Sequence, residues 1–148
     1  MTHGPLYTIG YEGRGIQQFI NLLQEYQITR LIDVREIPLS RKKGFSKTGL
    51  QERLAKEKIE YVHIRALGSP REIRHKLRLD SNYAAFFEAF KNHLSQNLGS
   101  VADIYQYLTD GINCIMCFES HPERCHRSTV AQKVKEHGGN GLAIKHIP

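Results

Sequence analysis

Short runs of consecutive hydrophobic residues alternate along the chain with apolar residues spaced three or four positions apart. Continuous runs predict buried parallel strands, at residues 6–9, 31–34, 61–64, 112–118 and 142–147. Helical spacing predicts helices over 15–26, from 46 toward 59, over 83–98, over 101–111 and over 122–138. Residues 71–79 are charged and weakly patterned, and they fit either a lid or a short helix.

Several helix ends are predicted from single residues. Ser46 is suited to cap the second helix, and Asp80 or Ser81 the third, because their side chains accept hydrogen bonds from free backbone N–H groups. Leu98, followed by a glycine, is expected to end the third helix. Pro122 is expected in the first turn of the last helix.

Alternating strands and helices predict one three-layer α/β domain over residues 1–148. Its sheet should be mostly parallel and Rossmann-like, with helices on both faces. The chain has 148 residues, of which 40% are hydrophobic and 24% charged, as is typical of a globular domain. Residues 112–118 are the most apolar run and should form the central strand, whereas 142–147 should form an edge strand.

Positive charge is concentrated in one part of the chain. The sequence has 21 Lys and Arg residues against 15 Asp and Glu residues, a net charge of +6. Residues 35–78 alone hold 13 basic residues and five glutamates. A basic surface of this kind attracts phosphates and polyanions. The alternative is an ordinary solvated basic face.

Hydropathy and cysteine usage indicate a cytoplasmic protein. No apolar run reaches 18 residues, and residues 1–10 lack the charged and hydrophobic regions of a secretory signal. Neither a transmembrane helix nor a membrane partner is therefore expected. Cys114, Cys117 and Cys125 are an odd number clustered within 12 positions, which does not suit a secreted disulfide framework. Reduced thiols are expected.

Polar side chains stand at the carboxyl ends of the predicted strands, where parallel sheets bind ligands. They include Tyr11, Asp33, Arg35, Cys117 and Glu119. Asp33 and Arg35 are two positions apart, as are Cys117 and Glu119, so each pair shares one face of its strand. These ends are expected to converge on one cleft. A stabilising ion pair and an inert core cysteine are the alternatives.

The residues that follow the central strand fit an anion site at a helix start. Free N–H groups and the helix dipole there can hold a phosphate, with Arg127 binding it and His126 donating a hydrogen bond. The same field would lower the pKa of Cys125. Arg124 lies one residue too far from Cys117 for the C-x5-R loop of cysteine phosphatases, so that motif is absent.

No metal and no cofactor are expected. Zinc ligand types do cluster here, at Cys114, Cys117, Glu119, Cys125 and His126. However, Cys114 and Cys117 are three apart in a strand and should point to opposite faces, whereas a Cys-x2-Cys zinc site needs a turn. A reversible Cys117–Cys125 disulfide stays open, because the sequence does not determine the distance between their Cα atoms.

Six short motifs occur in order between Tyr7 and Val134. They occupy residues 8–12, 31–41, 44–47, 67–68, 117–119 and 125–127. Together they resemble the domain of unknown function 488 family. The resemblance implies a compact α/β domain, found mainly in bacteria and archaea, without an established activity.

The favoured hypothesis is an enzyme that acts on a phosphate-bearing substrate, a nucleotide or nucleic acid, at the carboxyl edge of the sheet. The catalytic candidates are Asp33, Glu119, Cys117 and Cys125. The anion-binding candidates are Tyr11, Arg35, Ser40, Arg41, Lys47, His126 and Arg127. The alternatives are a non-catalytic nucleic-acid-binding module that uses residues 35–78, and a thiol redox sensor. Reaction, substrate and oligomeric state are left open.

Overall fold

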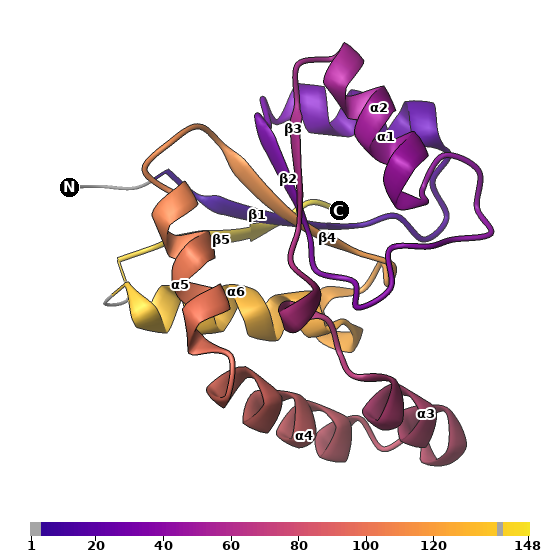
Figure 1. The fold of residues 1–148 in the computed structure, drawn as a ribbon, viewed down its shortest axis with the longest axis vertical. Coiled ribbons are helices and arrows are strands. Elements are labelled where there is room, and N and C mark those ends of the chain that lie inside the picture. The colour runs from indigo at the N-terminus through magenta and orange to yellow at the C-terminus, as the bar shows by residue number, and fades with distance from the viewer. Residues whose placement is uncertain (1–3, 139–140) are drawn as a thin grey trace.

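A five-stranded sheet forms the middle layer of the computed structural model, which describes residues 4–138 and 141–148 (Figure 1). The strand order is β3-β2-β4-β1-β5, and every pairing between these strands is parallel. The strands are β1 (Leu6–Gly10), β2 (Arg30–Asp33), β3 (Glu60–His63), β4 (Asn113–Cys117) and β5 (Ile144–His146). As predicted from its apolar run, β4 is central, and all five of its residues are buried.

Helices connect the strands. In the part of the chain that the structure describes they are α1 (Ile16–Glu25), α2 (Lys47–Lys56), α3 (Arg71–Asp80), α4 (Tyr83–Ser95), α5 (Leu98–Tyr107) and α6 (His126–His137). Two short 3-10 helices, η1 (Arg65–Leu67) and η2 (Pro122–Arg124), lie in the loops after β3 and β4. Within residues 4–138 and 141–148, no helix has the length and apolarity needed to span a membrane.

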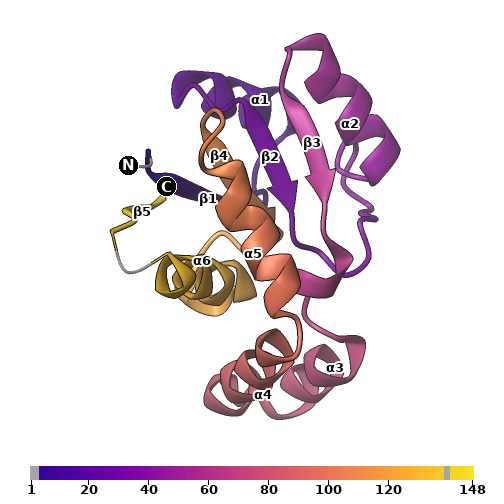
Figure 2. The same cartoon turned by 60° about the vertical axis from the view of Figure 1, so that its left-hand side comes forward.

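Helices cover both faces of the sheet (Figure 2). On one face, Phe19 of α1 and Leu54 of α2 belong to the same buried cluster. On the other, Phe90 of α4, Ile104 of α5 and Val130 of α6 belong to a second cluster. The predicted three-layer α/β architecture around a parallel, Rossmann-like sheet is confirmed.

The pleat of β4 sends its two cysteines into different layers. Cys114 lies in the cluster that α1 and α2 cover, together with Met116. Cys117 lies in the cluster that α4, α5 and α6 cover. The predicted opposition of these two side chains is confirmed, because residues three apart on a strand face opposite sides.

The third helix starts at Tyr83 as predicted, but its predicted cap and its predicted C-terminal end are wrong. The chain leaves the helical conformation at Ser95, and Leu98 begins α5 instead of ending α4. Neither Asp80 nor Ser81 caps α4, because Asp80 still belongs to α3. The cap is Asn82, whose side chain accepts a hydrogen bond of 3.0 Å from a first-turn backbone N–H.

Two further helix starts differ from expectation. Ser46 precedes α2 without capping it, because its hydroxyl bonds to the backbone of the preceding loop instead. Pro122 begins η2 rather than the last helix, and α6 starts only at His126. Cys125 takes the capping position there, with its sulfur accepting a backbone hydrogen bond of 3.4 Å.

The segment that could have been a lid or a helix is a helix, α3. It packs against α4 and lies beyond the carboxyl ends of β2 and β3 (Figure 2). None of its residues is fully buried, and Leu79 is 75% exposed. This helix therefore borders the site and reaches the core only through Ile73, which packs partly buried against the cluster that contains Phe90.

Candidate functional site

A cavity of about 550 Å³ lies at the carboxyl ends of the strands. The chain just beyond β1, β2 and β4 places Tyr11, Arg35 and Glu119 in its wall, and α3 and α6 add Arg74 and His126. Its volume falls within the range of small-molecule sites. Its position follows the rule that open parallel sheets bind ligands beyond their strand ends.

A buried ion pair supports one side of this cavity. Arg35 donates to Asp33 through Nη2 at 2.7 Å and through Nε at 2.9 Å. The Tyr61 hydroxyl donates to the same carboxylate at 2.5 Å. Arg35 Nη1 also donates to the Phe45 carbonyl at 2.7 Å and to the Tyr11 hydroxyl at 3.3 Å. Asp33 is fully buried behind the wall, so its contacts orient Arg35.

These contacts keep the charges of the pair in place. Burial opposes the charge of Arg35, but the hydrogen bonds and attraction of Asp33 outweigh it and raise the pKa of Arg35. Burial, followed by the nearby Asp33 charge, also raises the pKa of Tyr61, so that its hydroxyl remains a donor. Because desolvation of a buried pair is costly, both charges depend on this complete set of hydrogen bonds.

The loop over residues 118–125 passes directly against β1. Gly10 permits this approach, because a Cβ at that position would overlap the backbone carbonyl of Glu119. Glu12 accepts hydrogen bonds from the backbone N–H and hydroxyl of Ser120, both at 3.0 Å. The backbone hydrogen bond is the main cause of the lowered pKa of Glu12. The Glu12 side chain thereby fixes this loop against the end of β1.

Arg127 holds the same loop from inside. Its side chain is fully buried and donates to the carbonyl oxygens of Glu119 and Ser120. It also donates to the Thr8 hydroxyl at 3.1 Å and to Cys117 Sγ at 3.4 Å. Burial lowers the pKa of Arg127 to about 10, which leaves it charged at neutral pH. The hydrogen bonds of the Arg127 guanidinium are therefore made to protein acceptors behind the cavity wall, and not to the cavity itself.

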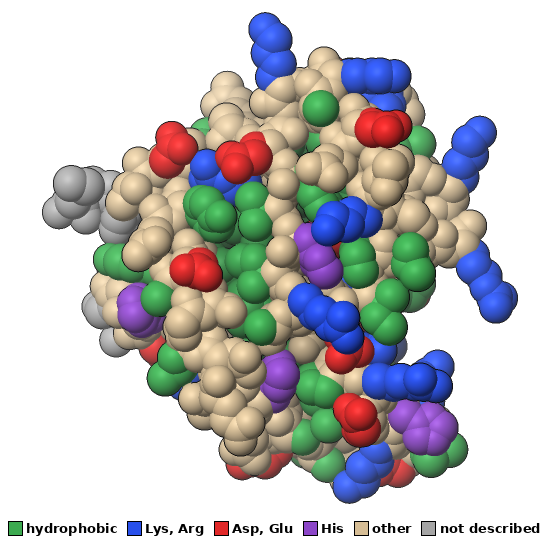
Figure 3. All heavy atoms as spheres, viewed as in Figure 1, with side chains coloured by type: hydrophobic (Ala, Val, Ile, Leu, Met, Phe, Trp, Pro, Cys, Tyr) green, Lys and Arg blue, Asp and Glu red, His purple; other side chains and the backbone are tan. Residues whose placement is uncertain are grey.

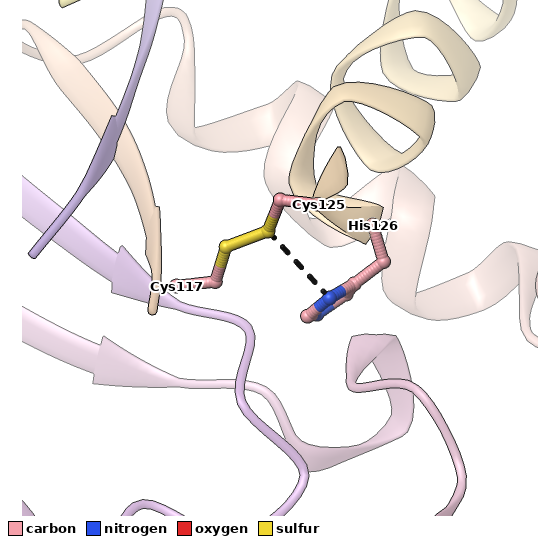
Figure 4. A group of neighbouring side chains, drawn as sticks. All are labelled: Cys117, Cys125 and His126. Carbon is pink, nitrogen blue, oxygen red and sulfur yellow. Dashed lines mark hydrogen bonds between the residues drawn. A yellow bond between two sulfur atoms is a disulfide. The ribbon is translucent and has the colours of Figure 1, made fainter. Parts of the chain in front are cut away.

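The sulfur atoms of Cys117 and Cys125 are joined in a disulfide at the cavity (Figure 4). The expectation of reduced thiols throughout is thus corrected: the loop folds back and brings the end of β4 to the start of α6. Cys114 is the free cysteine of the described chain. Its burial raises the pKa of the Cys114 thiol well above its usual value.

His126 lies beside the disulfide, with its Nδ1 3.8 Å from Cys125 Sγ (Figure 4). Its Nε2 is 2.6 Å from the Val34 carbonyl oxygen. Because a carbonyl can only accept, Nε2 carries the hydrogen. Burial lowers the pKa of His126 to about 4, so the ring is neutral at pH 7 and Nδ1 keeps its lone pair.

Glu119 is a partly buried carboxyl group in the cavity wall. Burial, followed by the charge of Glu12, raises the pKa of Glu119. The other carboxyl group in the wall, Glu36, forms an ion pair of 2.9 Å with Arg74. A carboxyl group with a raised pKa is suited to proton transfer.

The candidate residues separate into three groups. Six of them line the cavity: Tyr11, Arg35, Cys117, Glu119, Cys125 and His126. Asp33 and Arg127 are fully buried behind it. Ser40, Arg41 and Lys47 lie on the loop before α2 and in its first turn, outside the cavity lining.

Three arginines of the cavity were missed by sequence reasoning. They are Arg74 and Arg78 on α3 and Arg124 in η2. Arg78 and Arg124 are exposed and form no ion pair with any other described residue. The charged segment 71–79 was the available signal, but without an apolar period its placement could not be predicted.

The basic residues of segment 35–78 are spread mainly over the surface. Nine of the thirteen are exposed: Arg41, Lys43, Lys47, Lys56, Lys58, Arg65, Arg71, Lys76 and Arg78. In Figure 3, Lys and Arg side chains project mainly from the side of the molecule that carries α2 and α3. Most of these charges therefore lie outside the cavity.

Comparison with known proteins identifies the family of the chain. The model of the family described as "domain of unknown function DUF488" matches residues 15–134. The chain belongs to the DUF488 family. The DUF488 match runs from the loop before α1 into α6 and contains the cavity residues from Arg35 to His126. Neither a curated protein nor a solved structure matched the chain.

Proposed function

We propose that this DUF488 protein is an enzyme that acts on a phosphate-bearing substrate, a nucleotide or nucleic acid, in the cavity at the carboxyl edge of the sheet. The observation that carries the proposal is the charge of the cavity wall. Four arginines, Arg35, Arg74, Arg78 and Arg124, stand against two glutamates. A concave basic surface concentrates anions, and guanidinium groups match phosphate oxygens in geometry.

The arginines differ in their availability to a ligand. Arg35 lies in the cavity wall, but it is buried and its three side-chain nitrogens already donate to Asp33, Phe45 and Tyr11. Arg78 and Arg124 are exposed at the rim, and neither forms an ion pair with a described carboxylate, although the charge of Arg124 acts on Glu12 and Glu119. The two rim arginines are therefore the principal phosphate contacts in this proposal.

Groups capable of chemistry line the same cavity. Glu119 is the proton donor or acceptor in this proposal, because it is the cavity carboxyl group that forms no ion pair with a described residue. Cys117 and Cys125, once reduced, are the candidate nucleophiles. Asp33, whose oxygens already accept hydrogen bonds, positions Arg35.

Reversing the charge of the two rim arginines should weaken phosphate binding. The cavity variant, Arg78→Glu with Arg124→Glu, is compared with wild type by calorimetry, with pyrophosphate and ADP as probes. Each lost charge-assisted hydrogen bond contributes about 1.5–3 kcal/mol, so the affinity should fall at least about tenfold. Unchanged affinity in the cavity variant would remove this cavity as the phosphate site.

A loop variant with Arg41, Lys42 and Lys43 all changed to Glu is the control. These residues lie outside the cavity, so the loop variant should bind ADP like wild type. The loop variant also tests the alternative that the protein is a non-catalytic nucleic-acid-binding module. In that case the loop variant would bind single-stranded DNA more weakly, and the slope of log affinity against log salt concentration would fall in magnitude by about 0.7 per lost phosphate contact.

A thiol redox protein is the second candidate, and the Cys117–Cys125 disulfide is the observation that favours it. Both cysteines line the cavity, so a small thiol or oxidant would approach from this side, although the residues are only 1% and 2% exposed. The pair is also separated from Cys114, which lies on the opposite face of the sheet. Exchange would therefore be confined to two of the three cysteines.

The number of cysteines that can be alkylated after unfolding should differ between the oxidised and the reduced protein. In protein purified without reductant, Cys114 alone should be modified, and incubation of the folded protein with dithiothreitol should make all three modifiable. The Cys125→Ser variant is the control, since Cys117 should then be modified without reductant. Mass spectrometry assigns the sites, and three modified cysteines in the unreduced wild type would exclude this candidate.

A further inference from the structure

We propose that the reduced protein binds one divalent metal ion of the zinc class through Cys117, Cys125 and His126. The sulfur atoms of the two cysteines and a ring nitrogen of the histidine lie within 4.8 Å of one another (Figure 4). Thiolate and imidazole are the ligand types that zinc prefers. The proposal goes beyond the function proposed above and does not depend on the identity of the substrate.

The spacing of the ligand atoms fits a tetrahedral ion. With Zn–S and Zn–N bonds of about 2.3 and 2.1 Å, a sulfur and a nitrogen ligand lie about 3.6 Å apart. The observed distance from Cys125 Sγ to His126 Nδ1 is 3.8 Å. The Cα atoms of Cys117 and Cys125 are 7.3 Å apart, which leaves room for an ion between the two side chains after reduction.

Hydrogen bonds with neighbouring residues orient His126 and stabilise negative charge on the two sulfur atoms. The Val34 carbonyl accepts the Nε2 hydrogen of His126, so the free lone pair is on Nδ1, the nitrogen that faces the sulfur. Metal-bound histidines characteristically donate their second N–H in this way. Arg127 donates to both sulfurs, through its backbone N–H to Cys125 and through Nη1 to Cys117, each at 3.4 Å. Such donors stabilise thiolate charge.

The location leaves one coordination position for a ligand from the cavity. All three residues line the cavity wall, so an ion held there faces the cavity space. Three protein ligands with an open fourth position are characteristic of catalytic zinc, whereas structural zinc has four. Cys114 cannot complete the set, because it points into the opposite layer.

The metal form and the disulfide form exclude each other. Reduction by a dithiol breaks the Cys117–Cys125 bond: two electrons and two protons pass to the sulfurs, and the reductant becomes its own disulfide. Binding of the ion then displaces both thiol protons. With the ion bound, the two sulfurs serve as ligands rather than nucleophiles, and the polarising group is the metal.

Titration of the reduced protein with Zn²⁺ alone, and separately with Co²⁺ alone, tests the proposal. The protein is reduced with a phosphine without air and freed of metal with a chelator. We expect one equivalent of Zn²⁺ bound, two protons released per ion, and a Co²⁺ spectrum with thiolate charge-transfer absorption. The disulfide form should bind neither ion at this site.

Single variants assign the ligands. Loss of supporting residues around a metal typically costs 10–100-fold in affinity, so Cys117→Ser, Cys125→Ser and His126→Ala should each weaken Zn²⁺ binding by at least about 100-fold. Cys114→Ala is the matched control and should bind Zn²⁺ like wild type. Wild-type affinity in His126→Ala, or a loss in Cys114→Ala equal to that in Cys125→Ser, would overturn the proposal.

The cobalt spectrum of the wild type needs no substitution, so it decides the matter even if a variant fails to fold. Absence of thiolate absorption, or no binding of either ion, would also overturn the proposal. ADP binding to the disulfide form is measured without metal. The phosphate site and the metal site can therefore fail independently of each other.

Discussion

Asp33→Ala should lower the free energy of unfolding by about 3–5 kcal/mol, the usual cost of removing one partner of a buried ion pair. The variant would leave the Arg35 guanidinium buried without its carboxylate, and the Tyr61 hydroxyl without its acceptor. Urea denaturation of wild type and variant measures the difference. The larger part of the loss comes from the uncompensated charge.

Asp110→Ala is the matched control. Asp110 also accepts a hydrogen bond from an arginine, Arg30, at 3.1 Å, but its side chain is 82% exposed. Arg30 is itself buried, but it keeps the Glu60 carboxylate and the Asn113 side-chain oxygen, both at 2.9 Å, when the solvated Asp110 carboxylate is lost. This variant should therefore lose less than about 1 kcal/mol. Equal losses in the two variants would show that burial of the Asp33–Arg35 pair is not what makes it important.

Arg127→Leu should lower the free energy of unfolding by about 3 kcal/mol. Hydrogen bonds to a charged donor contribute about 1.5–3 kcal/mol each, and leucine would leave the carbonyl oxygens of Glu119 and Ser120 without this donor. Burial of leucine recovers part of the loss, since the site is fully enclosed. Thermal and urea unfolding give the measurement.

Arg124→Leu is the control, because Arg124 lies in the same loop region but is exposed. It should change stability by no more than about 0.5 kcal/mol. A small effect of Arg127→Leu, similar to that of the control, would mean that the loop is held by Gly10 and Glu12 rather than by the buried guanidinium.

The strands could be predicted because a parallel strand covered on both faces must be apolar throughout, and β4 satisfies this over five buried residues. Helix ends were harder, because several polar residues in succession can cap. Asn82 caps α4 because α3 continues through Asp80, and α3 packs against α4. The local sequence pattern around residues 80–82 carries no information on this contact between helices.

The site was predictable in position but less so in the roles of its residues. Arg127 looked like a phosphate ligand because arginines at helix starts often face solvent, whereas here the loop closes over it. Arg78 was overlooked because its helix lacks a buried stripe. The pairing of Cys117 with Cys125 depends on how an eight-residue span folds back, which spacing alone does not determine.

The placement of α3 has an evolutionary consequence. This helix contributes Arg74 and Arg78 to the cavity, yet none of its residues is fully buried. Substitutions at its exposed positions, Arg78 among them, usually change stability little, so selection on folding scarcely constrains them. If the proposed function is correct, ligand preference can diverge among descendants of this chain through α3, while the groups at the strand ends stay the same.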